Sequence, residues 1–327
     1  MMSDLPIITA VICTRNKAQF LDKCIKSLLV QSLDQEKYEI LVVDNGSTDT
    51  TCDVIKYFED EATIRSIYEP VIGLSRARNT GWKNARGQYV GYIDDDAIAE
   101  VGWLKSALWC FENLSPMPDW TGGPINLEWE TNSPDWVNEE LNVPLGKVYW
   151  GEKPCRLTYD QRLGGGNSFF QKVRLKELGG FEEQLGRKHG SLLSGEETQL
   201  QKRIEAEGGF LYYHPGICIR HFVSAERTRP SWFYRRYYWG GVSDYIMGKT
   251  LESKGLLHDE KTEEVTKGNR KEQIERVMRN FWRSLGVFSS EKEVIYGRIY
   301  MSYVWGWIVS LFQWYLKKLF NLSHAGK

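Results

Sequence analysis

The sequence of 327 residues lacks the features that identify several protein classes. Its six cysteines, at 13, 24, 52, 110, 155 and 218, are widely spaced and form no CxxC pair. That spacing excludes a zinc-finger-like site and favours reduced cysteines in a cytosolic protein. Basic and acidic residues nearly balance, with 42 Lys and Arg against 43 Asp and Glu, so no nucleic-acid partner is expected. The start, MMSDLPIITAVICT, has neither the basic segment nor the small-residue cleavage site of a signal peptide, so we expect a cytoplasmic location.

What is present indicates a folded domain with an unusual wealth of aromatic residues. Hydrophobic residues make up 42% and charged residues 26% of the chain, which predicts a sizeable packed core. There are 13 Trp and 17 Tyr, and many of them follow residue 230.

Strand and helix signals alternate over the first 130 residues. Apolar runs predict strands at 7–14, 40–43, 64–68 and 89–93. Helical spacing of apolar residues predicts helices at 20–30, 54–58, 75–85 and 103–111. Weaker signals predict strands at 120–127, 166–171 and 210–214, and helices at 173–178 and 196–207. The predicted fold is α/β, a doubly wound, mostly parallel, Rossmann-like sheet in a domain of residues 1–225, with a helical extension over residues 226–327.

Polar residues follow three of the predicted strands. These residues are Thr14, Arg15 and Asn16 after the first strand, Asp44, Asn45 and Ser47 after the second, and Asp94, Asp95 and Asp96 after the fourth. In an open parallel sheet, ligands bind beyond the carboxyl ends of the strands. Asp44 alone fits a helix N-cap or a turn. Beside a second acidic cluster at the same edge, ligand contact is the better interpretation.

The three consecutive aspartates predict a cation site. In an extended segment Asp94 and Asp96 point to one side and Asp95 to the other. Two carboxylates facing a pocket suit Mg²⁺ or Mn²⁺ bound to phosphate oxygens. The alternative is a solvated acidic turn, although three charges exceed what a helix cap needs. His221 supports the cation site only if the fold brings it near the aspartates.

Three further signals are weaker. Glu196 and Glu197 open a predicted helix, where they either complement the helix dipole or supply a general base. Gly165, Gly166 and Asn167 precede a strand and could let the backbone approach a diphosphate or a sugar. Arg78 lies on the first turns of a helix, where it can pair with acids or phosphates; for its neighbour Arg76 we favour a solvated surface.

In this order the motifs TRN, LVVDNGSTD, GLSRARNTG, YVGYIDDDA, GGGNSFF, LGGFEEQL, SGEETQL and IRH resemble the family-2 inverting glycosyltransferases of GT-A fold. The resemblance spans about residues 7 to 225. It implies transfer of a sugar from a nucleotide-diphospho-sugar, such as a UDP- or GDP-sugar, to a hydroxyl of a carbohydrate or a lipid-linked acceptor, in polysaccharide or glycolipid assembly.

The resemblance also implies roles for individual residues. Asp44 would bind the nucleotide base, and the aspartate trio occupies the place of the family's DxD motif. Ribose contacts would come from one or more of these acids, and Asp96 would bind Mn²⁺ or Mg²⁺, with Asp94 as a further ligand. His221 matches a histidine that completes the metal site in some relatives.

The acidic pair is the implied source of the catalytic base. The second member of the family's pair acts as the base, which here is Glu197, although Asp is commoner at that position. The choice between Glu196 and Glu197 therefore stays open. The resemblance implies a single displacement with inversion, and the absence of a QxxRW-like signature predicts one sugar per encounter.

Two other function classes remain as alternatives. A nucleotidyltransferase would use a similar sheet but needs a glycine-rich basic loop after the first strand, which is absent. A non-catalytic nucleotide-sugar-binding protein is the other. The sequence names neither the donor sugar nor the acceptor.

The last hundred residues point to a surface or a membrane partner. Residues 251–272 are charge-dense and fit a linker. An amphipathic helix follows, with apolar Ile274–Leu285 positions and Arg276, Arg279 and Arg283 on its polar side. Residues 299–316 carry no formal charge but are rich in Trp and Tyr, which suits a membrane interface better than a hydrocarbon core. We expect peripheral association with the cytoplasmic face of a membrane; packing on the core and a homo-oligomer contact are the alternatives.

Overall fold

The computed structural model describes residues 5–158, 160–256, 270–286 and 289–324. They form two compact units. The first comprises residues up to 133 together with 137–183 and 196–224, and the second comprises 134–136, 184–195 and the described residues from 225 onward.

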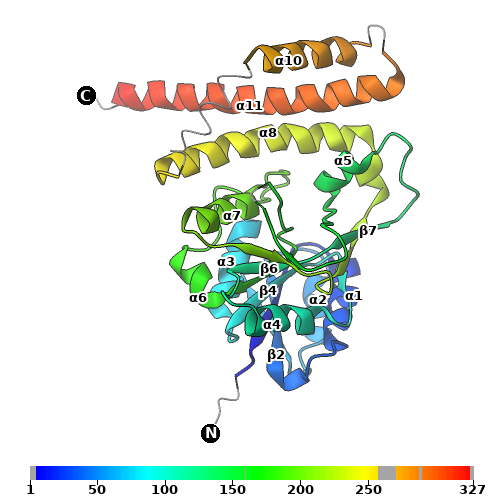
Figure 1. Ribbon diagram of the computed structural model, residues 1–327, viewed down its shortest axis with the longest axis vertical. Helices are drawn as coiled ribbons and strands as arrows, with labels where there is room; N and C mark the ends of the chain where they lie inside the picture. The colour runs from blue at the N-terminus through cyan, green and yellow to red at the C-terminus, as the bar shows by residue number, and fades with distance from the viewer. Residues whose placement is uncertain (1–4, 159, 257–269, 287–288, 325–327) are drawn as a thin grey trace. The chain divides into compact units, whose positions relative to one another are not determined.

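The first unit is built on a mixed sheet of eight strands in the order β3-β2-β1-β4-β9-β6-β10-β8. The strands are β1 (Ile8–Thr14), β2 (Tyr38–Asp44), β3 (Ile64–Tyr68), β4 (Tyr89–Asp94), β6 (Trp120–Gly122), β8 (Cys155–Arg156), β9 (Asn167–Gln171) and β10 (Leu211–Tyr213) (Figure 1). Strands β1 to β4 are mutually parallel, and β9 is antiparallel to both neighbours. The mostly parallel doubly wound sheet predicted from the sequence is confirmed.

Helices cover both faces of this sheet. One face carries α1 (Ala18–Leu29), α2 (Thr51–Tyr57) and α4 (Trp103–Asn113), and the other carries α3 (Leu74–Asn84), α6 (Lys172–Glu177) and α7 (Glu196–Ala206) (Figure 1). Side chains of β1 alternate between the two cores: Ile8, Ala10 and Ile12 pack on the first face and Val11 on the second. This double burial is the reason why the strands are unbroken apolar runs.

The register of the parallel strands aligns their carboxyl ends. Thr14 lies opposite Asp44, and Cys13 lies opposite Asp94. The polar residues that follow β1, β2 and β4 therefore meet at one edge of the sheet, as the sequence predicts.

A second, three-stranded sheet lies in the same unit and was not expected in this form. It contains β5 (Ala97–Ala99), β11 (Ile219–Val223) and β7 (Ile125–Trp129) in that order. The sequence interpretation joined β6 and β7 into one strand at 120–127. The chain instead leaves the main sheet after Gly122, because Pro124 and two preceding glycines interrupt the run. This unit also contains two short 3₁₀ turns, at Gln35–Lys37 and Val143–Leu145, and the short helix α5 (Glu139–Asn142).

The second unit is helical. It contains α8 (Pro230–Ser253), α10 (Arg270–Ser284) and α11 (Glu291–His324), after a short turn at Ala225–Thr228 (Figure 1). Gly241 of α8 and Gly306 of α11 allow these two helices to approach closely, because a Cβ at either position would collide with backbone atoms of the other helix. Residues 257–269 of the linker predicted at 251–272 lie outside the described residues. The ends of the predicted linker are helical, because α8 extends to Ser253 and α10 begins at Arg270. In the part of the chain that the structure describes, no helix has the length and apolar character required to cross a membrane.

Candidate active site

The loops after β1 and β2 are tied together at the sheet edge. Asn16 donates its backbone N–H to Ser47 Oγ at 3.0 Å and accepts the Thr48 N–H on its side-chain oxygen at 2.7 Å. Ser47 in turn donates its N–H to Asp44 Oδ1 at 3.0 Å. Asn16 has φ 54°, a left-handed conformation that Asn tolerates better than most residues. Arg15, between Thr14 and Asn16, is exposed at this edge.

The aspartate trio divides into two directions, as alternation predicts. Asp95 accepts the hydroxyl of Thr14 at 2.8 Å and is buried. Burial and the neighbouring Asp96 carboxylate raise the pKa of Asp95 to about 7. Asp94 and Asp96 lie together on the other side.

His221 completes a cluster with these two acids. Strand β11 pairs with β5, which places His221 opposite Ala97, the residue after the trio. The backbone N–H of Phe222 donates to the Asp96 carbonyl at 2.9 Å, and His221 Nε2 lies 3.2 Å from Asp96 Oδ1. One ligand atom from each of Asp94, Asp96 and His221 lies within 4.8 Å of the other two. Two carboxylates and one imidazole fit Mn²⁺ well and Mg²⁺ less well, because the nitrogen ligand is softer.

Lys17 is a site residue that the sequence interpretation missed. Its Nζ lies 3.1 Å from Asp96 Oδ2 and 5.0 Å from the centroid of the Phe20 ring. The ammonium offsets part of the negative charge of the aspartate trio. Its position three residues beyond Thr14, at the end of a buried strand, was the available signal.

Arg78 is buried between the aspartate trio and the acidic pair of α7. Its Nη1 donates to Glu196 Oε1 at 2.7 Å, its Nη2 lies 3.8 Å from Asp94 Oδ1, and its guanidinium lies 5.5 Å from the Phe181 ring centroid. Only 4% of the side chain is exposed. Arg78, expected at the donor nucleotide, thus links the two acidic clusters.

The glycines before β9 make this packing possible. A Cβ at Gly165 would lie 2.9 Å from Arg78 Nη2, and one at Gly166 would collide with the Asp94 carboxylate. Asn167 is fully buried, accepting the Trp103 indole N–H and donating to the Pro124 and Ile217 carbonyls. These hydrogen bonds link the two sheets, and a sugar contact at Asn167 stays a prediction.

Glu196 and Glu197 are the first residues of α7. Glu196 is buried against Arg78, whereas Glu197 is partly exposed. Burial and the neighbouring Glu197 raise the pKa of Glu196 to about 8, against the lowering effect of Arg78, and the two carboxyl groups share a hydrogen bond. The pair therefore holds one proton near neutral pH, as closely spaced carboxylates do.

This proton gives a pH dependence of stability. The folded protein keeps the Glu196 proton up to about pH 8, whereas the unfolded chain releases it near 4.5. We therefore expect this residue's contribution to the unfolding free energy to fall as the pH rises through that window. Urea unfolding of wild type and Glu196→Gln between these pH values measures it. The difference between the two curves should change with pH, whereas a Glu112→Gln control at an exposed position should parallel wild type; parallel curves for Glu196→Gln would refute the assignment.

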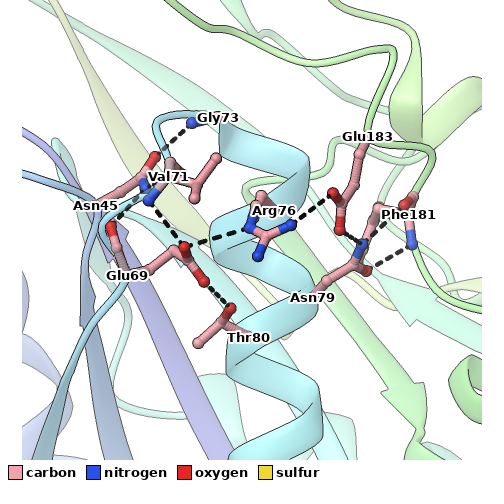
Figure 2. Close-up of polar contacts among 9 residues, drawn as sticks. All are labelled: Asn45, Glu69, Val71, Gly73, Arg76, Asn79, Thr80, Phe181 and Glu183. Atoms are coloured by element: carbon pink, nitrogen blue, oxygen red, sulfur yellow. Dashed lines mark hydrogen bonds and ion pairs between the residues drawn. The ribbon is translucent and has the colours of Figure 1, made fainter.

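A second polar network holds the loop between β3 and α3 beside Asp44 (Figure 2). The side-chain amide of Asn45 donates to the carbonyls of Glu69 and Val71 at 3.0 and 2.8 Å, and its oxygen accepts the Gly73 N–H at 2.8 Å. The buried carboxylate of Glu69 accepts from the Val71 N–H, the Arg76 guanidinium and the Thr80 hydroxyl. This network fixes the conformation of the 69–73 loop.

Residues of α3 also bind the segment around Phe181 and Glu183, which precedes α7 in the chain. Asn79 exchanges two hydrogen bonds with the Phe181 backbone, and Arg76 Nη1 lies 3.2 Å from Glu183 Oε2 (Figure 2). Arg76 is thus ion-paired on both sides, although its side chain stays 43% exposed.

Glu69→Gln tests the network. The NH₂ group of a glutamine would face N–H and O–H groups that now donate hydrogen bonds to the carboxylate. We therefore expect a loss of about 2 kcal/mol in unfolding free energy. Denaturant titration measures this change, with the exposed Glu61→Gln as the matched control. An equal stability of the two variants would show that the network contributes nothing.

Comparison with known proteins supports the family resemblance. Residues 9–114 match the model of glycosyl transferase family 2. The chain is 27% identical over 248 residues to a glucosyl-dolichyl phosphate glucuronosyltransferase of Haloferax volcanii, covering 73% of this chain and 77% of the relative. It is 26% identical over 240 residues, 68% of each chain, to a dolichyl N-acetyl-alpha-D-glucosaminyl phosphate 3-beta-D-2,3-diacetamido-2,3-dideoxy-beta-D-glucuronosyltransferase of Methanococcus voltae.

Among solved structures, a mannosyltransferase of Pyrobaculum calidifontis in complex with GDP-Man and Mn²⁺ superposes with a TM-score of 0.58 at 15% identity, over 94% of this chain and 88% of the other. That likeness concerns the fold. Sequence motifs and family model agree that residues 9–114 belong to glycosyl transferase family 2, and the fold is of GT-A type.

Proposed function

We propose that this glycosyltransferase moves a sugar from a nucleotide-diphospho-sugar to an acceptor hydroxyl, with a divalent cation and with inversion at the anomeric carbon. The observation that carries the proposal is the juxtaposition of two acidic groups. One group is the cluster of possible metal ligands, Asp94, Asp96 and His221, and the other is the carboxyl pair Glu196 and Glu197. Arg78 contacts both, through Asp94 and Glu196.

The donor nucleotide lies at the edge formed by β1, β2 and β4. Asp44 hydrogen-bonds the base, and the tied loops around Asn16 and Ser47 hold Asp44 in place. Asp95, fixed by Thr14, contacts the ribose. Asp94, Asp96 and His221 would hold Mn²⁺ or Mg²⁺, which would supply positive charge to offset the charge on the departing diphosphate. Lys17 adds a fixed positive charge beside Asp96.

Glu197 is the base that removes the acceptor proton. Arg78 donates a hydrogen bond to the buried Glu196 at 2.7 Å, and Glu197 is the partly exposed member of the acidic pair. Because the base acts on the acceptor oxygen as it attacks opposite the leaving diphosphate, the transfer is a single displacement. The family resemblance and the absence of a processive signature support addition of one sugar per encounter.

A lipid-linked acceptor on the cytoplasmic side of a membrane fits the relatives best. Both curated relatives named above carry a dolichyl phosphate in the name of their reaction. An acceptor of this class places the enzyme at the membrane surface, in glycolipid or polysaccharide assembly. The donor nucleotide is a UDP- or GDP-sugar; the mannosyltransferase of the same fold was solved with GDP-Man.

Product stereochemistry tests this proposal. Transfer from a panel of UDP- and GDP-sugars with Mn²⁺ should give, by NMR of the anomeric proton, a product whose configuration is opposite to that of the donor. A product of retained configuration, or turnover that chelation with EDTA leaves unchanged, would contradict it.

A further inference from the structure

Helix α10 packs in the reverse of the usual orientation of an amphipathic helix. Such a helix normally buries its apolar side and exposes its polar side. Here the polar side faces α11: the Ser284 carbonyl accepts from Arg298 Nε at 3.2 Å, Arg283 lies 3.7 Å from Glu293, and the Arg276 guanidinium lies 5.6 Å from the Tyr300 ring centroid. The sequence predicted the helix but not which side would be buried.

The apolar side of α10 is consequently exposed. It consists of Met278, Phe281, Trp282 and Leu285, which are 39% to 57% exposed. Spacings of three and four residues place these side chains on one face of the helix. We call this set the α10 stripe.

Helix α11 carries a second exposed stripe. Its side toward α8 is filled: Tyr303 donates its hydroxyl to Asp244 at 2.7 Å, and Trp307 packs edge-on against Tyr245. Trp305, Ile308, Phe312 and Tyr315 follow one another at spacings of three and four residues and are 43% to 63% exposed. This set, the α11 stripe, lies on the side of the helix away from these α8 contacts.

Helices α10 and α11 each carry a net positive charge. Helix α10 contains five Lys or Arg residues against two Glu, and α11 contains four against two, whereas the whole chain has a net charge of −1. Trp, Tyr and Phe beside Lys and Arg form the composition that settles at the interface of an anionic bilayer.

We propose that the α10 and α11 stripes together form the surface with which the enzyme docks on an anionic membrane. A second copy of the chain is the less favourable occupant, because a two-fold contact would bring two cationic faces together. The inference rests on the proposed membrane location of the acceptor, and it adds the residues and the lipid charge that mediate docking. The rings lie in the headgroup region, and the exposed Arg279, beside the α10 stripe, contacts lipid phosphates.

Vesicle flotation of the full chain tests docking separately from transfer, because it needs neither donor nor metal. Wild type should float with vesicles of phosphatidylcholine and phosphatidylglycerol, and weakly with phosphatidylcholine alone. The double variant Trp282→Ser/Phe312→Ser has one change in each stripe. Its partition constant for the anionic vesicles should be about tenfold lower than that of wild type. Arg279→Gln should reduce only the preference for anionic vesicles. Tyr57→Ser, at an exposed aromatic residue of α2, is the matched control and should float like wild type.

Other outcomes would overturn the inference. They are equal flotation of the double variant and wild type, or no flotation of wild type with either vesicle. A wild-type dimer that the double variant dissociates, seen by light scattering, would assign the stripes to a second copy instead. Unfolding temperatures show that each variant is folded. Transfer to a water-soluble acceptor should be unchanged in the double variant. A wild type that transfers sugar but floats with neither vesicle would refute this inference and leave the proposed function intact.

Discussion

Glu197→Gln is expected to lower kcat by about 10²–10⁴-fold, the usual contribution of a positioned general base. The amide keeps the shape of the side chain but cannot accept the proton of the acceptor hydroxyl. Donor affinity should stay near that of wild type, because the proposed donor contacts come from the other edge of the site. Steady-state transfer at saturating donor, together with donor titration, separates these two effects.

Glu196→Gln is the matched control, since the two residues are adjacent and the substitution is the same. The glutamine keeps an oxygen that can accept the hydrogen bond from Arg78, so measurable turnover should remain. The opposite pattern, with turnover lost in Glu196→Gln and kept in Glu197→Gln, would assign the base to Glu196.

Asp96→Asn is expected to remove the stabilisation by Mn²⁺. A ligand that binds only the folded state adds about 2.7 kcal/mol at a concentration of 100 times its Kd, which raises the unfolding temperature by several degrees. Asp96 lies between His221 and Lys17, so its loss leaves one carboxylate and one imidazole in the cluster. Thermal unfolding with increasing Mn²⁺ measures the effect.

Asp60→Asn, at an exposed position of the same unit, controls for a change of one charge. It should respond to Mn²⁺ as wild type does. A full Mn²⁺ response in Asp96→Asn would show that the cation binds elsewhere, and the proposed donor site would then lack its metal.

The parts of the fold that the sequence predicted are those with strong periodic burial. Strands β1 to β4 are buried on both sides and therefore read as continuous apolar runs, and parallel pairing then places Asp44 and Asp94 at one edge. The motif order predicted the family for the same reason, since it fixes which loops meet. The placement of these residues followed from local patterns alone.

What the sequence could not predict depends on contacts between distant segments. Strand β11, which places His221 beside Asp96, is five residues long and pairs with segments about one hundred residues away. Lys17 belongs to the site only because its ammonium contacts Asp96. Asn167 is buried because its side chain hydrogen-bonds to three separate segments. The reversed orientation of α10 depends on α11, because its periodicity alone favours burial of the apolar side.

Donor binding is expected to require the cation held by Asp94, Asp96 and His221. Isothermal titration calorimetry of a UDP- and a GDP-sugar, with Mn²⁺ and with EDTA, measures this requirement. Heat of binding is expected for one of these donors with Mn²⁺ and none in EDTA. Binding of equal affinity in both conditions would contradict it.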